Sequence, residues 1–231
     1  MTPKLSPVAE NLAGVRDRIA RACVRAGRRA EEVTLVAVSK TFPAEAILAA
    51  YVAGLRVFGE NRVQDLESKQ PRIAALDATW HLIGHLQSNK VRRAIHLFDR
   101  IDSVDRAPLA QKIDSAASEG TRMPVLIEVH LGDEATKGGV AENDLEALAE
   151  GVAALPHLEL RGLMAIPPYS DDPERARPYF EKLRKLRDDL GRRLMLPLPA
   201  LSMGMSHDFE VAIEEGATEI RIGTALFGAR Q

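Results

Sequence analysis

The sequence has one cysteine and no long apolar run, and each absence narrows the class of protein. Cys23 has no partner elsewhere in the chain, so an internal disulfide is excluded. The spacings CxxC and HExxH are absent, and we expect no dedicated transition-metal site. The N-terminus MTPKLSPVAE lacks the basic and apolar segments of a signal peptide. No apolar run approaches the roughly 18 residues of a membrane span, so a reduced, cytoplasmic protein without a membrane partner is predicted.

Neither sign of charge is in excess. The formal net charge of -2 gives no reason to expect a polyanionic partner. Basic runs occur at 90–93 and 182–193, but Asp188 and Asp189 interrupt the second run, which favours a solvated helix face over nucleic-acid binding. No linker rich in Gly, Ser or Pro divides the chain, and we expect one domain over residues 1–231.

What the sequence does contain is a regular alternation of short apolar runs and helical patterns. The predicted strands are 33–40, 56–60, 79–84, 98–104, 124–131, 158–166, 200–204 and 219–225. The predicted helices between them are 43–53, 61–75, 105–119, 142–154, 173–190 and 207–215, with a shorter piece at 88–97. Eight such units predict an α/β fold in which a parallel sheet closes into a single (β/α)8 TIM barrel.

A helix is also predicted before the first strand. Ser6 and Pro7 suit an N-cap and a first turn, and an apolar face then recurs until the helix stops near Gly27. Because the chain ends too soon after the eighth strand for a further helix, we expect this N-terminal helix to complete the outer ring. An open doubly wound sheet is the alternative, but no GxGxxG turn follows the first strand.

The first predicted strand, VTLVAVSK, is apolar until it ends on Lys40. In a (β/α)8 barrel the functional face lies at the C-terminal ends of the strands, where this lysine would stand. A lysine amine is a nucleophile only when it is unprotonated, and burial beside other cations favours that form. The alternative is a surface lysine that extends into solvent.

Two further motifs fall at the ends of the seventh and eighth predicted strands. Ser206 would be the N-cap of helix 207–215, where unpaired N–H groups and a hydroxyl can bind an anion. Arg221 and Gly223 alternate onto one face of the eighth strand, and Thr224 adds a hydroxyl. The loops after these two strands often hold phosphate in (β/α)8 barrels. A strand-end lysine facing a phosphate cup predicts a phosphorylated aldehyde as the ligand.

Six motifs follow one another along nearly the whole chain. They are VAVSKT at 36–41, GENRVQ at 59–64, WHLIGHLQSNK at 80–90, GLMAIP at 162–167, LSMGMS at 201–206 and RIGTALFG at 221–228. In this order the motifs resemble those of the pyridoxal phosphate homeostasis protein family, also called the YggS/PROSC family. The resemblance implies a barrel like the N-terminal domain of alanine racemase, with pyridoxal phosphate (PLP, pyridoxal 5'-phosphate) as its cofactor.

The resemblance also assigns a cofactor site. It implies a Schiff base between PLP and Lys40, phosphate contacts from the loops after strands seven and eight, and Arg221 near the pyridine nitrogen. The implied site residues are Lys40, Asn61, His81, Ser206, Arg221, Gly223 and Thr224. Asn61 and His81 would lie near the cofactor ring. Lys137, in the loop after the fifth strand, is a weaker candidate for a ligand contact.

The same residues limit the chemistry. Pyridoxal enzymes that need a strong electron sink place a carboxylate at the pyridine nitrogen, and a cationic Arg221 there would disfavour transamination. Racemisation would need a second acid–base group on the other face of the substrate, and Tyr169 is the candidate in this chain. We therefore predict a monomeric protein that buffers PLP or delivers it to PLP-dependent apoenzymes, without robust catalysis of its own.

Three alternatives stay open. The first is a PLP-dependent amino-acid racemase, in which turnover would depend on Lys40. The second is a Schiff-base aldolase, which would use the same lysine and phosphate cup without a pyridoxal chromophore. The third is an interaction scaffold that binds no ligand.

Overall fold

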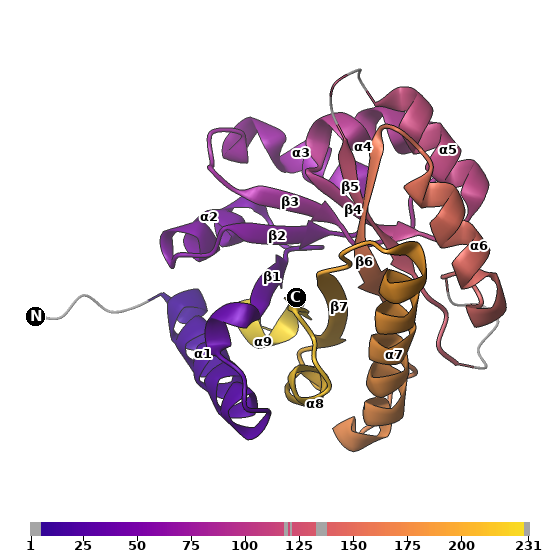
Figure 1. The fold of residues 1–231 in the computed structure, drawn as a ribbon. Coiled ribbons are helices and arrows are strands. Elements are labelled where there is room, and N and C mark those ends of the chain that lie inside the picture. Colours follow the sequence, from indigo (N-terminus) through magenta and orange to yellow (C-terminus); the bar gives the residue numbers. More distant parts are fainter. Residues whose placement is uncertain (1–5, 118–119, 121, 133–137, 229–231) are drawn as a thin grey trace, which may run out of the picture.

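Eight parallel strands close into a barrel in the computed structural model, which describes residues 6–117, 120, 122–132 and 138–228 (Figure 1). The strands are β1 (Thr34–Val38), β2 (Val57–Glu60), β3 (Thr79–Leu82), β4 (Arg100–Val104), β5 (Met123–Glu128), β6 (Leu158–Met164), β7 (Ala200–Met205) and β8 (Glu219–Ile222). They pair in sequence order, and β1 closes the ring against β8 with Val36 opposite Arg221. The predicted (β/α)8 TIM barrel is confirmed.

Helices surround the barrel on its outer side (Figure 1). The α-helices of the described residues are α1 (Pro7–Arg25), α2 (Ala44–Val52), α3 (Val63–Ile73), α4 (Val91–Leu97), α5 (Ala107–Ala116), α6 (Glu142–Ala153), α7 (Arg177–Leu194), α8 (Phe209–Glu214) and α9 (Thr224–Phe227). Short 3₁₀ turns occur at η1 (Ala30–Glu32), η2 (Ser88–Lys90) and η3 (Pro173–Ala176). In the described part of the chain, no helix is both long and apolar enough to cross a bilayer.

The N-terminal helix α1 begins and ends where the sequence predicts. The hydroxyl of Ser6 accepts a hydrogen bond from the backbone N–H of Ala9 at 3.3 Å, and Pro7 occupies the first turn. The helix stops at Arg25, shortly before Gly27, whose φ is +64°. Its buried face packs against α2, α8 and α9, so α1 completes the outer ring as predicted.

Two of the strands that end earlier than predicted, β1 and β8, leave site residues on turns. β1 stops at Val38, so Lys40 stands two residues beyond the strand. β8 stops at Ile222, and Thr224 begins α9. The expectation that no helix follows the eighth strand is therefore wrong: the Gly223 carbonyl accepts from the N–H groups of Leu226 and Phe227 at 2.9 Å, which closes one helical turn.

The helix after β7 also starts later than predicted. α8 begins at Phe209, with Asp208 as its N-cap position, because residues 206–208 form a turn of their own. Gly204, on β7, has a φ of +88°, and a Cβ there would lie 2.5 Å from the Cβ of Ala212. Only glycine at this position lets α8 approach the strand so closely, which fixes the loop that carries Ser206.

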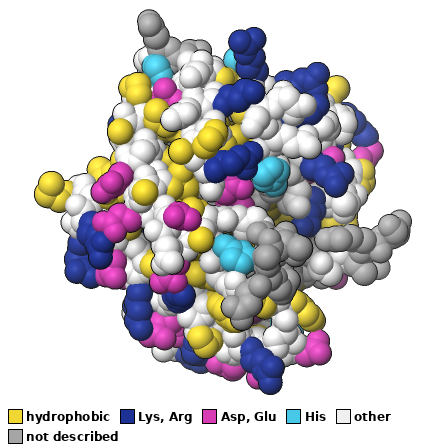
Figure 2. Space-filling view, turned by 90° about the vertical axis from the view of Figure 1, so that its right-hand side faces the viewer, with side chains coloured by type: hydrophobic (Ala, Val, Ile, Leu, Met, Phe, Trp, Pro, Cys, Tyr) yellow, Lys and Arg dark blue, Asp and Glu magenta, His cyan; other side chains and the backbone are white. Residues whose placement is uncertain are grey.

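The outer face of α7 carries mixed charge. Its ion pairs include Lys182 with Glu142, Lys185 with Glu181, Arg192 with Asp189 and Arg193 with Glu146. Figure 2 shows basic and acidic side chains interspersed over one face of the molecule. The basic run at 182–193 therefore lies on a solvated helix face, as its pattern predicts.

The barrel carries buried polar and charged side chains, in contrast to the apolar layer between the strands and the helices. Buried hydrophobic side chains pack the helices onto the outer face of the strands. The buried polar side chains are Ser39, Glu60, His81, Asp102, Ser103, Glu128, Ser202, Asp208, Glu219 and Arg221. Arg100 on β4 reaches Glu219 on β8, and these strands lie on opposite sides of the ring, so this ion pair spans the barrel interior.

Candidate functional site

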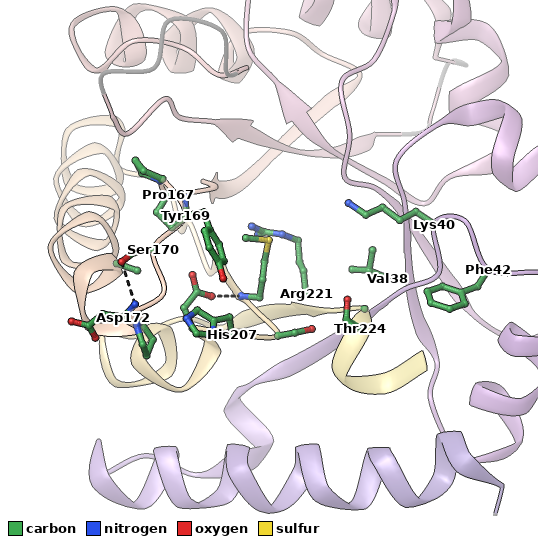
Figure 3. A pocket seen from close by; sticks show the side chains of 17 residues that line it. Val38, Lys40, Phe42, Pro167, Tyr169, Ser170, Asp172, His207, Arg221 and Thr224 are labelled. Atoms are coloured by element: carbon green, nitrogen blue, oxygen red, sulfur yellow. Dashed lines mark hydrogen bonds between the residues drawn. The ribbon is translucent and has the colours of Figure 1, made fainter. Parts of the chain in front are cut away.

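A cavity of about 400 Å³ opens at the C-terminal ends of the strands (Figure 3). Segments that follow β1, β6, β7 and β8 form its walls. Five of the predicted site residues line it, namely Lys40, Ser206, Arg221, Gly223 and Thr224. Barrel closure brings these residues together, because β8 pairs with β1 although they are distant in sequence.

Lys40 extends from the β1 side into this cavity (Figure 3). Its side chain is half-buried rather than fully exposed, which disfavours the alternative of a surface lysine in solvent. Val38 lines the cavity next to it, and Tyr169 lies on the opposite side in Figure 3. The amine therefore faces a cavity large enough for an aromatic ring.

Arg221 is fixed inside the barrel at the base of the cavity. One guanidinium nitrogen donates to the hydroxyl of Ser202 at 2.7 Å, and the other donates to the carbonyl of Ala165 at 2.8 Å. Burial lowers the pKa of Arg221, while the carboxylates of Asp102 and Glu128 oppose that shift. The position of the Arg221 guanidinium is therefore set by its contacts with β7 and with the residue that follows β6.

Ser206 joins the loops after β7 and β8. Its hydroxyl accepts a hydrogen bond from the backbone N–H of Ala225 at 3.2 Å. The prediction that Ser206 caps the following helix is wrong, because Asp208 stands at that position and its carboxylate accepts from the N–H of Met205 at 2.6 Å. Ser and Asp both cap helices well, so the sequence SHD alone does not choose between them. Ser206 instead adds a hydroxyl to the wall that Gly223 and Thr224 share.

Asn61 and His81 are placed elsewhere. Neither is among the described residues that line the cavity. The backbone of Asn61 packs onto Gly84, where a Cβ would lie 2.4 Å from the Asn61 carbonyl oxygen. His81 is buried in the barrel interior, with its Nδ1 3.0 Å from a guanidinium nitrogen of Arg100. Their contact with a cofactor ring stays a prediction.

His81 belongs to a buried network of charges. Arg100 donates to Asp102 at 2.6 Å and to Glu219 at 2.7 Å. Because an arginine can only donate, Nδ1 of His81 accepts, and burial together with the Arg100 charge lowers the pKa of His81. The imidazole is therefore neutral. Although His81, Asp102 and Glu219 have metal-ligand spacing, Arg100 already occupies the space between them.

Glu128, at the end of β5, is a further buried carboxyl group. Burial raises its pKa to about 7, against the opposing influence of Arg221. Sequence analysis missed Arg100, Asp102, Glu128 and Glu219 as interior residues. The signal available in the sequence is a charged residue at a strand position whose side chain alternates toward the barrel interior.

Tyr169 lines the outer part of the cavity and is 76% exposed. Its hydroxyl donates to Asp171 at 3.2 Å, and this hydrogen bond raises the pKa of the phenol. Its ring centroid lies 5.8 Å from that of His207. Tyr169 is thus held at the rim by local contacts. Lys137, the other weaker candidate, lies outside the described residues.

The lysine after β1 and the donor cup after β7 and β8 define a barrel of the alanine racemase N-terminal type. A family model described as "Alanine racemase, N-terminal domain" matches residues 14–231. Alanine racemase from Corynebacterium glutamicum has the same fold, with a TM-score of 0.70 at 19% identity over 96% of this chain and 60% of that chain.

Closer similarity is found among shorter relatives. The pyridoxal phosphate homeostasis protein of Aquifex aeolicus is 51% identical over 96% of this chain and 98% of its own length. PipY of Synechococcus elongatus, solved with PLP bound, has a TM-score of 0.85 at 41% identity and covers 96% of this chain and 100% of that chain. The chain belongs to the pyridoxal phosphate homeostasis protein family.

Proposed function

We propose that the protein binds PLP in the cavity at the C-terminal end of the barrel, with the aldehyde carbon joined to Lys40 as a Schiff base. The observation that carries this proposal is the convergence of one lysine amine, one buried guanidinium and two hydroxyls on a single cavity of about 400 Å³. A solved relative, PipY, has PLP bound. An amine is the group that an aldehyde condenses with, and the hydroxyls of Ser206 and Thr224 are donors that suit a phosphate.

The residues present fit this cofactor. Ser206 and Thr224 would donate to the phosphate, and Gly223 leaves the backbone between them open to close approach. Arg221 would stand near the pyridine nitrogen and keep it unprotonated. Asn61 and His81, which do not line the cavity, complete the proposed set of cofactor-binding residues. When bound, the cofactor supplies an electrophilic aldehyde, and the chain holds it reversibly.

We further propose that the role of the protein is PLP homeostasis, by buffering the cofactor and delivering it to apoenzymes without robust catalysis. Support comes from the relatives, which are named as homeostasis proteins. It also comes from Arg221, whose charge disfavours protonation of the ring and so weakens its power to stabilise a carbanion. A single domain, a cytoplasmic location and a monomeric state are further predictions of this account.

Transfer to an apoenzyme tests the homeostasis role. PLP-loaded protein, freed of unbound cofactor, is mixed with a PLP-requiring apoenzyme, and recovery of that enzyme's activity is followed in time. We expect recovery with the wild type and none with Lys40→Ala carried through the same loading and washing steps. Equal recovery from the two proteins would contradict delivery from Lys40.

A racemase is the second candidate, because Tyr169 lines the same cavity as Lys40 on its opposite side. Loaded protein would be incubated with L-alanine and other amino acids, and the D-enantiomer measured by chiral chromatography. Enzyme-like turnover that is lost in both Lys40→Ala and Tyr169→Phe would establish the racemase. We expect no such turnover, since Tyr169 is exposed and bonded to Asp171.

A further inference from the structure

Lys69 of α3 reaches back toward the end of β1. Its ammonium donates to the Oε1 carboxylate oxygen of Glu60 at 2.7 Å and to the backbone carbonyl of Ser39 at 3.0 Å. The side chain of Lys69 is only 11% exposed, and that of Glu60 is fully buried. Ser39 immediately precedes Lys40, so this buried ion pair acts on the peptide unit next to the site lysine.

The segment that Lys69 contacts is a tight turn. The carbonyl of Ser39 also accepts from the N–H of Phe42 at 3.1 Å, which closes a four-residue turn with Lys40 and Thr41 at its centre. Thr41 has a φ of +68°, a left-handed conformation that is strained for a β-branched residue. Such a turn persists only when its surroundings hold it.

Two of the groups that hold this turn, the Ser39 hydroxyl and the Lys69 ammonium, both donate to Glu60. The hydroxyl of Ser39 donates to the same Glu60 oxygen at 2.7 Å, and the N–H of Ser39 donates to the carbonyl of Gly59 at 3.0 Å. Burial raises the pKa of Glu60, whereas Lys69 opposes that shift and favours the carboxylate. Without Lys69, the pKa of Glu60 would rise further, and the Ser39 carbonyl would lose one of its two donors.

We infer that Lys69 is a positioning residue for Lys40. Through Ser39 and Glu60 it holds the left-handed turn that presents the Lys40 amine to the cavity. This inference rests on the proposed function only in naming the PLP aldehyde as the group that the amine meets. Misplacing a reacting group by about 1 Å can cost about 100-fold in rate, so a loosened turn changes the reactivity of Lys40 even where the fold survives.

The test measures the Lys40 amine itself. Wild type, Lys69→Met and Lys69→Arg are acetylated with trace acetic anhydride between pH 6 and 11, and the Lys40 peptide is quantified by mass spectrometry. Arg retains the charge and can donate to both acceptors. We expect the rate of Lys40 labelling in Lys69→Met to differ from that of the wild type by about tenfold. Lys69→Arg should restore a profile close to that of the wild type.

Two further variants serve as a control and as an alternative in case Lys69→Met does not fold. Lys182→Met removes a lysine from a surface ion pair with Glu142 and should leave the Lys40 profile unchanged. Should an unpaired Glu60 prevent Lys69→Met from folding, Glu60→Gln/Lys69→Met removes both charges, and the same altered profile is expected. A folded variant of either kind with a wild-type Lys40 profile would overturn the inference.

The labelling experiment separates this inference from the proposed function. PLP binding is measured in parallel by reduction with borohydride and mass determination. If the wild type takes up no PLP, the proposed function fails, while the Lys40 labelling profile still decides the role of Lys69. If the wild type binds PLP and Lys69→Met binds about tenfold more weakly with an altered Lys40 profile, both stand.

Discussion

The hydroxyl of Ser206 accepts a hydrogen bond from the backbone N–H of Ala225 and so ties the loop after β7 to the turn after β8. The proton of that hydroxyl stays available to a ligand, because the bond to Ala225 uses an oxygen lone pair. Ser206 thus has two roles in this account, as a link between the two loops and as a donor to the phosphate.

Ser206→Ala is therefore expected to weaken PLP binding about tenfold, since a hydrogen bond to a charged group contributes about 1.5 kcal/mol or more. Pyridoxal, which has no phosphate, should bind the variant and the wild type alike. Equilibrium titration with both aldehydes measures the two effects. Ser68→Ala, which removes an exposed hydroxyl that donates to the Asp65 carbonyl within α3, is the matched control. Equal loss of PLP and pyridoxal binding would contradict the phosphate role.

Arg221→Met is expected to destabilise the fold. Arg221 is 4% exposed and its charge is opposed by the buried carboxylates of Asp102 and Glu128, so its removal leaves buried negative charge without its counter-ion. The free energy of unfolding in urea should fall by about 3–5 kcal/mol at pH 8. Arg161→Met, which breaks an exposed pair with Glu159, should cost less than about 1 kcal/mol. An equal loss of unfolding free energy in Arg221→Met and Arg161→Met would contradict a stabilising role for the buried charge of Arg221.

Glu128 gives the stability of the fold a pH dependence. Its pKa is raised from 4.5 to about 7, so the folded state holds its proton more tightly than the unfolded chain. Stability from this group is complete below about pH 4.5 and is lost as the pH rises through 7, by an amount on the order of 3 kcal/mol at most. Glu128→Gln should thus be more stable than the wild type at pH 8 but not at pH 5.

Urea unfolding at the two pH values measures this difference. A Glu128→Gln variant with the same stability change at pH 5 and pH 8 would show that the carboxyl group does not titrate in this range. Glu142→Gln provides the control, because its carboxylate is exposed on the outside of α6.

The acidic cluster inside the barrel is expected to bind no zinc. Arg100 occupies the space between His81, Asp102 and Glu219, and a divalent ion would have to displace its guanidinium. The melting temperature should therefore be the same with added Zn²⁺ and with EDTA. A rise with Zn²⁺ that His81→Ala abolishes would show a metal site, because a ligand that binds only the folded state stabilises it.

The residues that sequence reasoning brought together share one property: they lie at the C-terminal ends of strands or just after them. Strand order in a (β/α)8 barrel is fixed, so placing Lys40 after the first strand and Arg221 on the eighth already predicts that they meet. The meeting of Lys40 with the loops after β7 and β8 at one cavity was therefore predictable. The outer ring was predictable too, because the helical periodicity of α1 is strong.

The polar interior was harder to predict, for physical reasons. The Arg100–Glu219 pair joins residues 119 positions apart, and nothing local in the sequence links them. Thr41 is β-branched and so gives no sign of the left-handed turn it adopts. The choice between Ser206 and Asp208 as the helix cap depends on how closely Gly204 lets α8 approach, which is a tertiary effect.

The most direct measurement of the central claim is the visible absorbance of purified protein with added PLP, in the wild type and in Lys40→Ala. We expect a yellow band in the wild type that borohydride bleaches, with the reduced adduct on the Lys40 peptide, and no such band in the variant. Lys182→Ala, at an exposed lysine, should behave as the wild type. An equal band in wild type and Lys40→Ala, or no band in either, would contradict the account, because Lys40 would then not be the residue that holds the cofactor.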